Sequence, residues 1–219
     1  MSIARRALAD GLGTTLLLAV VVGSGIMGER LSGGNDALAL LANSLATGFA
    51  LIALILSFGP RSGAHFNPVV TIALALRKEF PIREALPYVA AQVVGALLGV
   101  LAAHAMFVLP LLQLGEQARF GAAQWWSEIV ATFGLVFVVL SCDRKSAPYA
   151  VGGYIAAAYW FTASTSFANP AVTLARGFTT TFSGIRPEDI AGFVLAQAAG
   201  AALAVAADRY FFDGKMGAQ

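Results

Sequence analysis

The sequence predicts an all-α membrane protein with six transmembrane helices and two shorter re-entrant half-helices. Three observations carry this prediction. The 219-residue chain is 58% hydrophobic and only 12% charged, against about 45–50% and about 25% in soluble globular domains. Long windows, such as residues 37–59 and 88–115, contain no charged side chain. Finally, an Asn-Pro pair interrupts two apolar stretches, "HFNPVVTIAL" and "FANPAVTLAR".

The apolar runs are long enough to cross a bilayer, because a helix of about 20 apolar residues spans the hydrocarbon core. We place the six spans at about residues 7–28, 37–58, 85–107, 125–142, 149–165 and 189–207. The first run follows Arg5 and Arg6, yet it is long and lacks a small-residue cleavage site, which favours a retained span over a signal peptide. The single cysteine, Cys142, ends the fourth span and excludes an internal disulfide.

The basic residues predict how the spans are oriented. With the N-terminus in the cytoplasm, ten of the 14 Lys and Arg residues, Lys215 among them, lie inside. The four outside are Arg30, Arg119, Arg176 and Arg186. Basic residues prefer the cytoplasmic side, so we expect both termini in the cytoplasm and a multi-pass protein of the inner (plasma) membrane. A net charge of +2 gives no indication of nucleic-acid binding.

The chain also contains an internal repeat, with residues 1–115 and 116–219 as its two halves within a single transmembrane domain. Besides the Asn-Pro pairs, "ADGLGTTLLLAVV" parallels "SEIVATFGLVFVV", and "AAQVVGALLG" parallels "LAQAAGAALA". Each half has three spans, an odd number, so the second half must be inverted. Inverted repeats with interrupted hydrophobic segments place a transport site near the bilayer midplane.

Each Asn-Pro pair predicts the start of a helix. Proline is tolerated at the first helical position, and asparagine is a preferred N-cap, so half-helices should begin at Pro68 and Pro170. Ten residues span about 15 Å, half of the hydrocarbon core. Two helix N-termini, each with a partial positive charge, then meet at the midplane. Irregular backbone at that depth is tolerated only where protein buries it or it lines a watery cavity, which indicates a pore.

These motifs resemble the aquaporin, or major intrinsic protein, family, and the resemblance covers nearly the whole chain. The two boxes of that family correspond here to Asn67-Pro68-Val69 and Asn169-Pro170-Ala171. The resemblance implies an aquaporin-like fold, a lipid-embedded homotetramer with one pore in each subunit, and no cofactor. An enzyme is not expected, because the sequence offers no nucleophile, metal cluster or phosphate loop, so no catalytic or metal-binding residue is assigned.

The resemblance also implies roles for individual polar residues. Asn67 and Asn169 would donate hydrogen bonds to a passing solute. Asp10 and Glu128 would hold the backbone of the re-entrant loops, although acids within spans by default suggest ion coupling. The remaining expected loop-supporting residues are His65, which either ties its loop or gates the mouth, and Gln92 and Gln197. His104 is expected to pack at the membrane interface.

The predicted selectivity filter departs from the family pattern. An arginine usually follows the second box asparagine by three residues, but Val172 stands there, and Thr173 stands where glycerol facilitators carry aspartate. Arg176, one turn later, is expected to be solvated. The other filter positions are expected at Thr47, Ser166 and near Ala157, with Tyr159 and Phe161 as alternatives for the last. These side chains predict a wide, uncharged filter.

We therefore expect a passive channel of an atypical, bacterial aquaglyceroporin-like kind, which passes water and small uncharged solutes and excludes protons and ions. Glycerol-like polyols, urea-like molecules and neutral metalloid hydroxides such as arsenite are the expected solutes. A proton-coupled secondary transporter that uses Asp10 or Glu128 is the alternative. A non-conducting structural membrane protein is a third possibility, which the intact asparagine pair disfavours.

Overall fold

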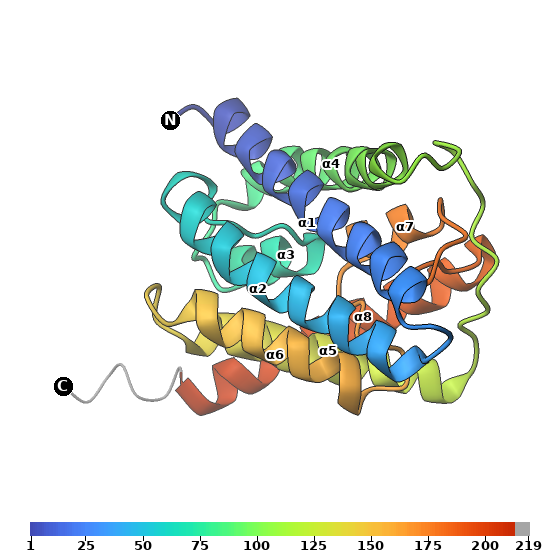
Figure 1. Ribbon diagram of the computed structural model, residues 1–219. Coiled ribbons are helices and arrows are strands. Elements are labelled where there is room, and N and C mark those ends of the chain that lie inside the picture. Colours follow the sequence, from blue (N-terminus) through green and yellow to red (C-terminus); the bar gives the residue numbers. More distant parts are fainter. Residues whose placement is uncertain (213–219) are drawn as a thin grey trace.

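The computed structural model describes residues 1–212, and these fold into eight α-helices and one short 3-10 turn, with no strand among them. The long helices lie side by side with their axes in roughly one direction, and the short helices lie between them (Figure 1). The long helices are α1 (Ile3–Leu31), α2 (Asp36–Ser62), α4 (Ala85–Met106), α5 (Ala122–Ser141), α6 (Ala147–Phe161) and α8 (Pro187–Phe212). The short ones are α3 (Pro68–Leu76) and α7 (Pro170–Arg176), and the turn η1 (Ile82–Glu84) precedes α4. The predicted all-α fold is confirmed.

Five helices, α1, α2, α4 with η1, α5 and α8, are long and apolar enough to cross a membrane. The sixth, α6, has only 15 residues, about 22 Å of helix. The span predicted at residues 149–165 is therefore wrong at its end, because α6 stops at Phe161. The next residues turn back toward the midplane, and Thr165 and Ser166 have positive φ angles that no continuing helix accepts.

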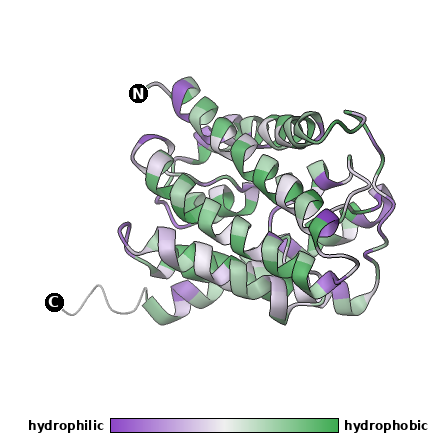
Figure 2. Cartoon of the chain, viewed as in Figure 1, coloured by the Kyte–Doolittle hydropathy of each residue, from purple (hydrophilic) through white to green (hydrophobic). Residues whose placement is uncertain are grey.

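The long helices consist mostly of hydrophobic residues, and hydrophilic residues gather near the two ends of the bundle (Figure 2). This distribution suits a helical protein embedded in lipid. The N-terminus and the end of α8 lie at one end of the bundle (Figure 1). We call this end the α3 side, and the opposite end, toward which α7 lies, the α7 side. Lys215 of the basic set lies outside the described residues.

The two halves of the chain pack in the same way. Helix α1 packs on α4, and α5 packs on α8 in the second half. Each pair closes over a glycine: a Cβ atom on Gly95 would lie 2.2 Å from the Gly11 carbonyl oxygen, and one on Gly200 would lie 2.4 Å from that of Ile129. The half-helices α3 and α7 each contact both α4 and α8. The inverted repeat thus brings the two half-helices together between the pairs.

Candidate functional site

The two half-helices begin in the same way. Asn67 caps α3 by accepting a hydrogen bond from the Val69 N–H at 3.1 Å. Asn169 caps α7 by accepting from Ala171 at 3.0 Å and from Val172 at 3.3 Å. Proline occupies the first turn in both helices, where its missing N–H has no partner to lose. The caps therefore fix the direction of each asparagine amide.

The two asparagines also tie the half-helices to each other. Asn67 Nδ2 donates to the Ala168 carbonyl oxygen at 2.8 Å, and Asn169 Nδ2 donates to that of Phe66, also at 2.8 Å. An amide nitrogen has two hydrogens, so one donor remains on each side chain after this exchange. Both asparagines line the same central cavity. Two fixed N–H donors, one from each half, thus meet where the half-helices begin.

Asp10 on α1 holds the loop that precedes α3. Its Oδ1 accepts from the Ser62 hydroxyl at 3.0 Å and from the His65 N–H at 2.9 Å. Its Oδ2 accepts from the Phe66 N–H at 3.0 Å and from Gln92 Nε2 at 2.7 Å. The carboxylate is fully buried, and these four bonds fill the acceptor positions of an ionised carboxylate.

Glu128 on α5 holds the loop that precedes α7 with the same pattern. Its Oε1 accepts from the Ser164 hydroxyl at 2.6 Å and from the Phe167 N–H at 2.9 Å. Its Oε2 accepts from the Ala168 N–H at 2.9 Å and from Gln197 Nε2 at 2.6 Å. The second repeat therefore reproduces, donor for donor, the brace that Asp10 forms in the first.

These braces support a strained backbone. Phe66 and Ala168, each directly before a box asparagine, have φ angles of 51° and 47°. The left-handed region costs about 1–2 kcal/mol for a residue with a side chain, and the carboxylates bind the N–H groups of these two residues. The strain places the Phe66 and Ala168 carbonyls where the opposite asparagine reaches them.

The glutamines link each brace to its half-helix. Gln92 Nε2 also donates to the Thr71 hydroxyl at 2.9 Å, and Gln197 Nε2 donates to that of Thr173 at 2.7 Å. Each threonine in turn donates to the carbonyl oxygen of the box asparagine in its own half. The Gln, the Thr and the Asn thus form one polar chain in each repeat.

A central cavity extends from His65 and Ala147 on the α3 side to Arg176 on the α7 side. The cavity has a volume of about 120 Å³. Most of its wall is apolar, with side chains such as Leu17, Leu51, Leu135 and Ile155. Polar groups come from Thr47, His65, Asn67, Tyr159, Ser166, Asn169 and Arg176.

Three of the four expected filter residues, Thr47, Ser166 and Val172, line this cavity. Ala157 does not: it is exposed on the outer face of α6. This expectation was wrong because the register of α6 is set by packing, and residues two apart lie about 200° apart around a helix. Tyr159 lines the cavity instead, with its hydroxyl 3.3 Å from Thr47 Oγ1. Phe161 faces outward and is 56% exposed.

Arg176 also departs from expectation, because it is only 2% exposed and lines the cavity. Its Nε donates to the Ser183 carbonyl oxygen. The expectation of an uncharged wall is therefore wrong, since the Arg176 guanidinium reaches it, whereas Tyr159 is one of the alternatives named for the third position. One signal for Arg176 was present in the sequence: residues four apart share a helix face, so Arg176 lies on the side of α7 that Val172 occupies.

The two histidines lie in different parts of the molecule. His65 lines the cavity on the α3 side, 3.1 Å from the Thr71 hydroxyl and beside the rings of Phe80 and Tyr88. His104 was expected at the membrane interface, but it is fully buried. Its ring nitrogens lie 2.9 Å from the Leu111 carbonyl oxygen and 2.8 Å from Thr179 Oγ1. His104 thus holds the connections that follow α4 and α7.

Comparison with known proteins identifies the family. A sequence model described as "Major intrinsic protein" matches residues 1–163. Aquaglyceroporin AqpS of Rhizobium meliloti (strain 1021) is 54% identical over 212 residues, which is 95% of this chain and 91% of AqpS. Aquaporin AqpM of Methanothermobacter marburgensis is 33% identical over 178 residues, or 71% of this chain and 72% of AqpM.

The fold agrees. The X-ray structure of the aquaglyceroporin from Plasmodium falciparum matches with a TM-score of 0.72 at 18% identity, over 99% of this chain and 98% of that one. The chain therefore belongs to the major intrinsic protein family, whose members are membrane channels for water and small solutes and not enzymes.

Proposed function

We propose that this chain is a passive channel for water and small uncharged solutes, and that the central cavity is its conduction path. The observation that carries the proposal is the pair of asparagine amides, each with one N–H left to donate, in the wall of an otherwise apolar cavity. A hydroxylated or amide solute that enters loses hydration along the apolar wall and regains hydrogen bonds at this pair. Glycerol-like polyols, urea-like molecules and neutral metalloid hydroxides such as arsenite have suitable chemistry.

The same pair suits the exclusion of protons. A water molecule that accepts hydrogen bonds from both Asn67 and Asn169 has its oxygen lone pairs occupied, so it cannot relay a proton along a file of waters. The N-termini of α3 and α7 carry partial positive charge at this point and oppose the entry of cations, which must also lose their hydration shells.

The braces argue for passive conduction over proton coupling. A coupling carboxylate must exchange protons with the conduction path, but neither Asp10 nor Glu128 lines the cavity. Each accepts four hydrogen bonds from the re-entrant loops and the glutamines. Protonation of either acid would replace an acceptor with a donor and break part of its brace. This favours the channel over the proton-coupled alternative.

We propose further that the chain assembles as a homotetramer in the plasma membrane with both termini in the cytoplasm. The support is the excess of basic residues on the N-terminal side of the predicted spans and the family to which the chain belongs.

The test of passive conduction is solute flux in proteoliposomes. Flux of glycerol and urea should follow the solute gradient and should not respond to a pH step or to a membrane potential. Empty liposomes and liposomes with Asn67→Leu/Asn169→Leu protein are the controls, because the leucine pair removes both donors. Uphill uptake driven by a proton gradient would show that the transporter alternative is correct.

Val172 provides a test of the size of the path. An arginine there would fill cross-section in the cavity wall and add a second guanidinium. Val172→Arg should therefore reduce glycerol permeability much more than water permeability, whereas the control Val172→Ile should change both little. The measurement is stopped-flow swelling at matched protein density. Equal reduction of the two permeabilities by Val172→Arg would contradict a size-selecting role for this position.

A further inference from the structure

Arg176 lies at the junction of two cavities. It lines the central cavity together with Val172, and it also lines a second cavity on the α7 side whose wall includes Arg119 and Trp160. We call this second cavity the vestibule. A solute that moves between the vestibule and the central cavity therefore passes Arg176. The position that usually carries the arginine of this family holds Val172, one helical turn closer to the asparagine pair.

The guanidinium of Arg176 is held in a fixed place. Its Nε donates to the Ser183 carbonyl oxygen, and its Cζ lies 3.4 Å from the centre of the Phe167 ring. That ring is itself fixed, because the Phe167 N–H donates to Glu128 and the ring packs edge-to-face on Phe193 at 5.1 Å. No further hydrogen bond of the Arg176 side chain occurs within residues 1–212. Its terminal nitrogens are thus left to the two cavities.

A second buried guanidinium, that of Arg119, stands beside the first. Arg119 Nε donates to the Gly184 carbonyl oxygen at 2.9 Å, and Nη1 donates to that of Ser164 at 3.3 Å. Its Cζ lies 4.9 Å from the centre of the Phe167 ring. Burial lowers the pKa of Arg119 to about 10, with the charge of Glu128 opposing the shift, so the group remains charged at neutral pH.

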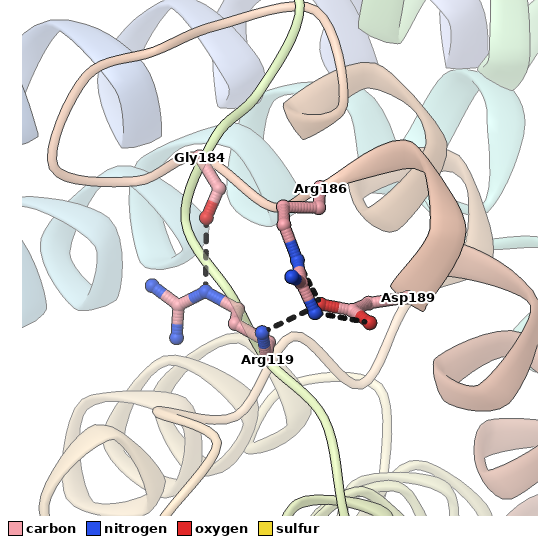
Figure 3. Close-up of polar contacts among 4 residues, drawn as sticks. All are labelled: Arg119, Gly184, Arg186 and Asp189. Carbon is pink, nitrogen blue, oxygen red and sulfur yellow. Dashed lines mark hydrogen bonds and ion pairs between the residues drawn. The ribbon is translucent and has the colours of Figure 1, made fainter.

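Carboxylates near this pair are engaged elsewhere. Asp189 forms an ion pair with Arg186 at 3.1 Å and accepts the backbone N–H of Arg119, while the Arg119 guanidinium points away from it (Figure 3). The oxygens of Glu128 are occupied by the loop before α7 and by Gln197 of α8. Asp36 lines the vestibule but is exposed to solvent. Within residues 1–212, neither Arg119 nor Arg176 forms an ion pair, so the junction keeps a positive charge.

We propose that this channel separates the selection of charge from the selection of size by one helical turn. Arg176, supported by Arg119, excludes cations at the junction. One turn closer to the asparagine pair, the small side chain of Val172 leaves the path wide enough for solutes larger than water. A single arginine at the Val172 position would perform both tasks in one place, because its side chain is both charged and bulky. This inference rests on the proposed passive channel and assigns its specificity-determining residue.

The experiment compares cation conductance with neutral flux in purified, reconstituted protein. Potassium and guanidinium currents are measured in planar bilayers, and water and glycerol permeabilities are measured by stopped-flow swelling. Arg176→Gln should raise the cation conductance at least about tenfold. At an effective dielectric constant of about 20, the repulsion between the guanidinium and a cation several ångströms away lowers the occupancy of the path by that cation more than about tenfold. Water and glycerol permeabilities are measured on the same Arg176→Gln protein, and continued water flux shows that its path is open.

Three matched variants accompany it. Arg176→Lys keeps the charge and should still exclude cations. Arg30→Gln removes an exposed arginine on the same side of the molecule and should change nothing. Val172→Phe adds bulk without charge, so it should reduce glycerol permeability while the cation conductance stays low. Opposite responses at Arg176 and Val172 would support the separation of the two selections.

The proposal is overturned if folded Arg176→Gln protein that still conducts water excludes potassium as well as the wild type does. If Arg176→Gln does not fold, Val172→Asp and Val172→Asn replace it. An aspartate four residues before Arg176 lies one helical turn away and neutralises its charge. Val172→Asp protein should therefore admit potassium, and Val172→Asn protein should not. Equal exclusion of potassium by the two variants overturns the proposal. Wild-type protein that passes no neutral solute would instead contradict the proposed channel function.

Discussion

The buried side chain of Glu128 positions a whole re-entrant loop. It binds two backbone N–H groups, one hydroxyl and one amide, and together these fix the loop that delivers Asn169. Asp10 performs the same task for Asn67. Acids inside a membrane usually mark ion pathways, but here all four acceptor positions of each carboxylate face protein. Their position away from the cavity is the reason that we assign them to the scaffold.

Substitution of Glu128 tests this assignment. Glu128→Leu should strongly lower the unfolding temperature, because each buried donor left without a partner costs about 1–3 kcal/mol. Glu128→Gln keeps one acceptor oxygen and should retain folded, conducting protein with a smaller loss. The measurement is thermal unfolding in detergent, followed by size-exclusion chromatography, with Glu116→Leu and Glu116→Gln as exposed controls. If both Glu128 variants were fully stable but blocked in transport, a coupling role would be the better explanation.

At the scale of secondary-structure elements, the helix pairs α1–α4 and α5–α8 form the framework that holds the half-helices. Both pairs approach closely at glycines, and at Gly95 the neighbouring atom is a backbone oxygen that cannot move aside as a flexible side chain can. Close approach over small residues is the usual way in which membrane helices associate. The Asp10–Gln92 hydrogen bond crosses the same α1–α4 interface. The glycine contact and the loop brace therefore depend on the same distance between α1 and α4.

Gly95→Ala should therefore destabilise the protein, since the added Cβ would lie 2.2 Å from the Gly11 carbonyl oxygen and would push α1 from α4. The matched control is Gly153→Ala in α6, where nothing beyond the adjoining backbone of its own helix lies within 4 Å of the added Cβ. Alanine is favoured over glycine in helices by about 1 kcal/mol, so the control should be neutral or stabilising. Thermal unfolding of both variants measures the difference. An equal rise in unfolding temperature for the two would contradict the close packing of α1 on α4.

The whole molecule has two chemically different ends joined by one path. The N-terminus, the α5–α6 connection and the end of α8 lie on the α3 side, and the connection from α4 to α5 lies on the α7 side (Figure 1). His65 contributes to the cavity wall toward the first end, and Arg176 contributes toward the second. The inverted repeat makes the two braces equivalent, but the residues at the two mouths of the cavity differ. The direction in which the chain crosses the membrane therefore decides which solution meets the arginine pair.

The single cysteine reports this direction. Cys142 directly follows α5, on the α3 side, and is partly exposed. With cytoplasmic termini, a membrane-impermeant maleimide should label Cys142 in inverted vesicles and leave it unlabelled in intact cells. The control Cys142→Ser/Glu116→Cys moves the thiol to the exposed α4–α5 connection and should give the opposite pattern. Labelling of Cys142 from outside intact cells would show that the orientation is reversed.

Much of this architecture follows from local patterns that the sequence contains. The apolar runs determined where the long helices lie, because burial in hydrocarbon depends on composition and length. The Asn-Pro pairs determined where α3 and α7 begin, because a cap and a first-turn proline act within a few residues. The paired acids and glutamines were identifiable because each occupies the same position in the parallel segments of the two halves, the acid before the box and the glutamine after it.

Only the tertiary structure decided which side chains face the lumen. The rotation of α6, which sends Tyr159 inward and Ala157 outward, depends on its packing against α2 and α5, and a helix that is apolar on all sides carries no periodicity to reveal it. The burial of Arg176 likewise depends on the segment after α7, which folds back so that the Ser183 carbonyl and the Phe167 ring receive the guanidinium. These partners are not neighbours along α7, so no local pattern in the sequence determines the contact.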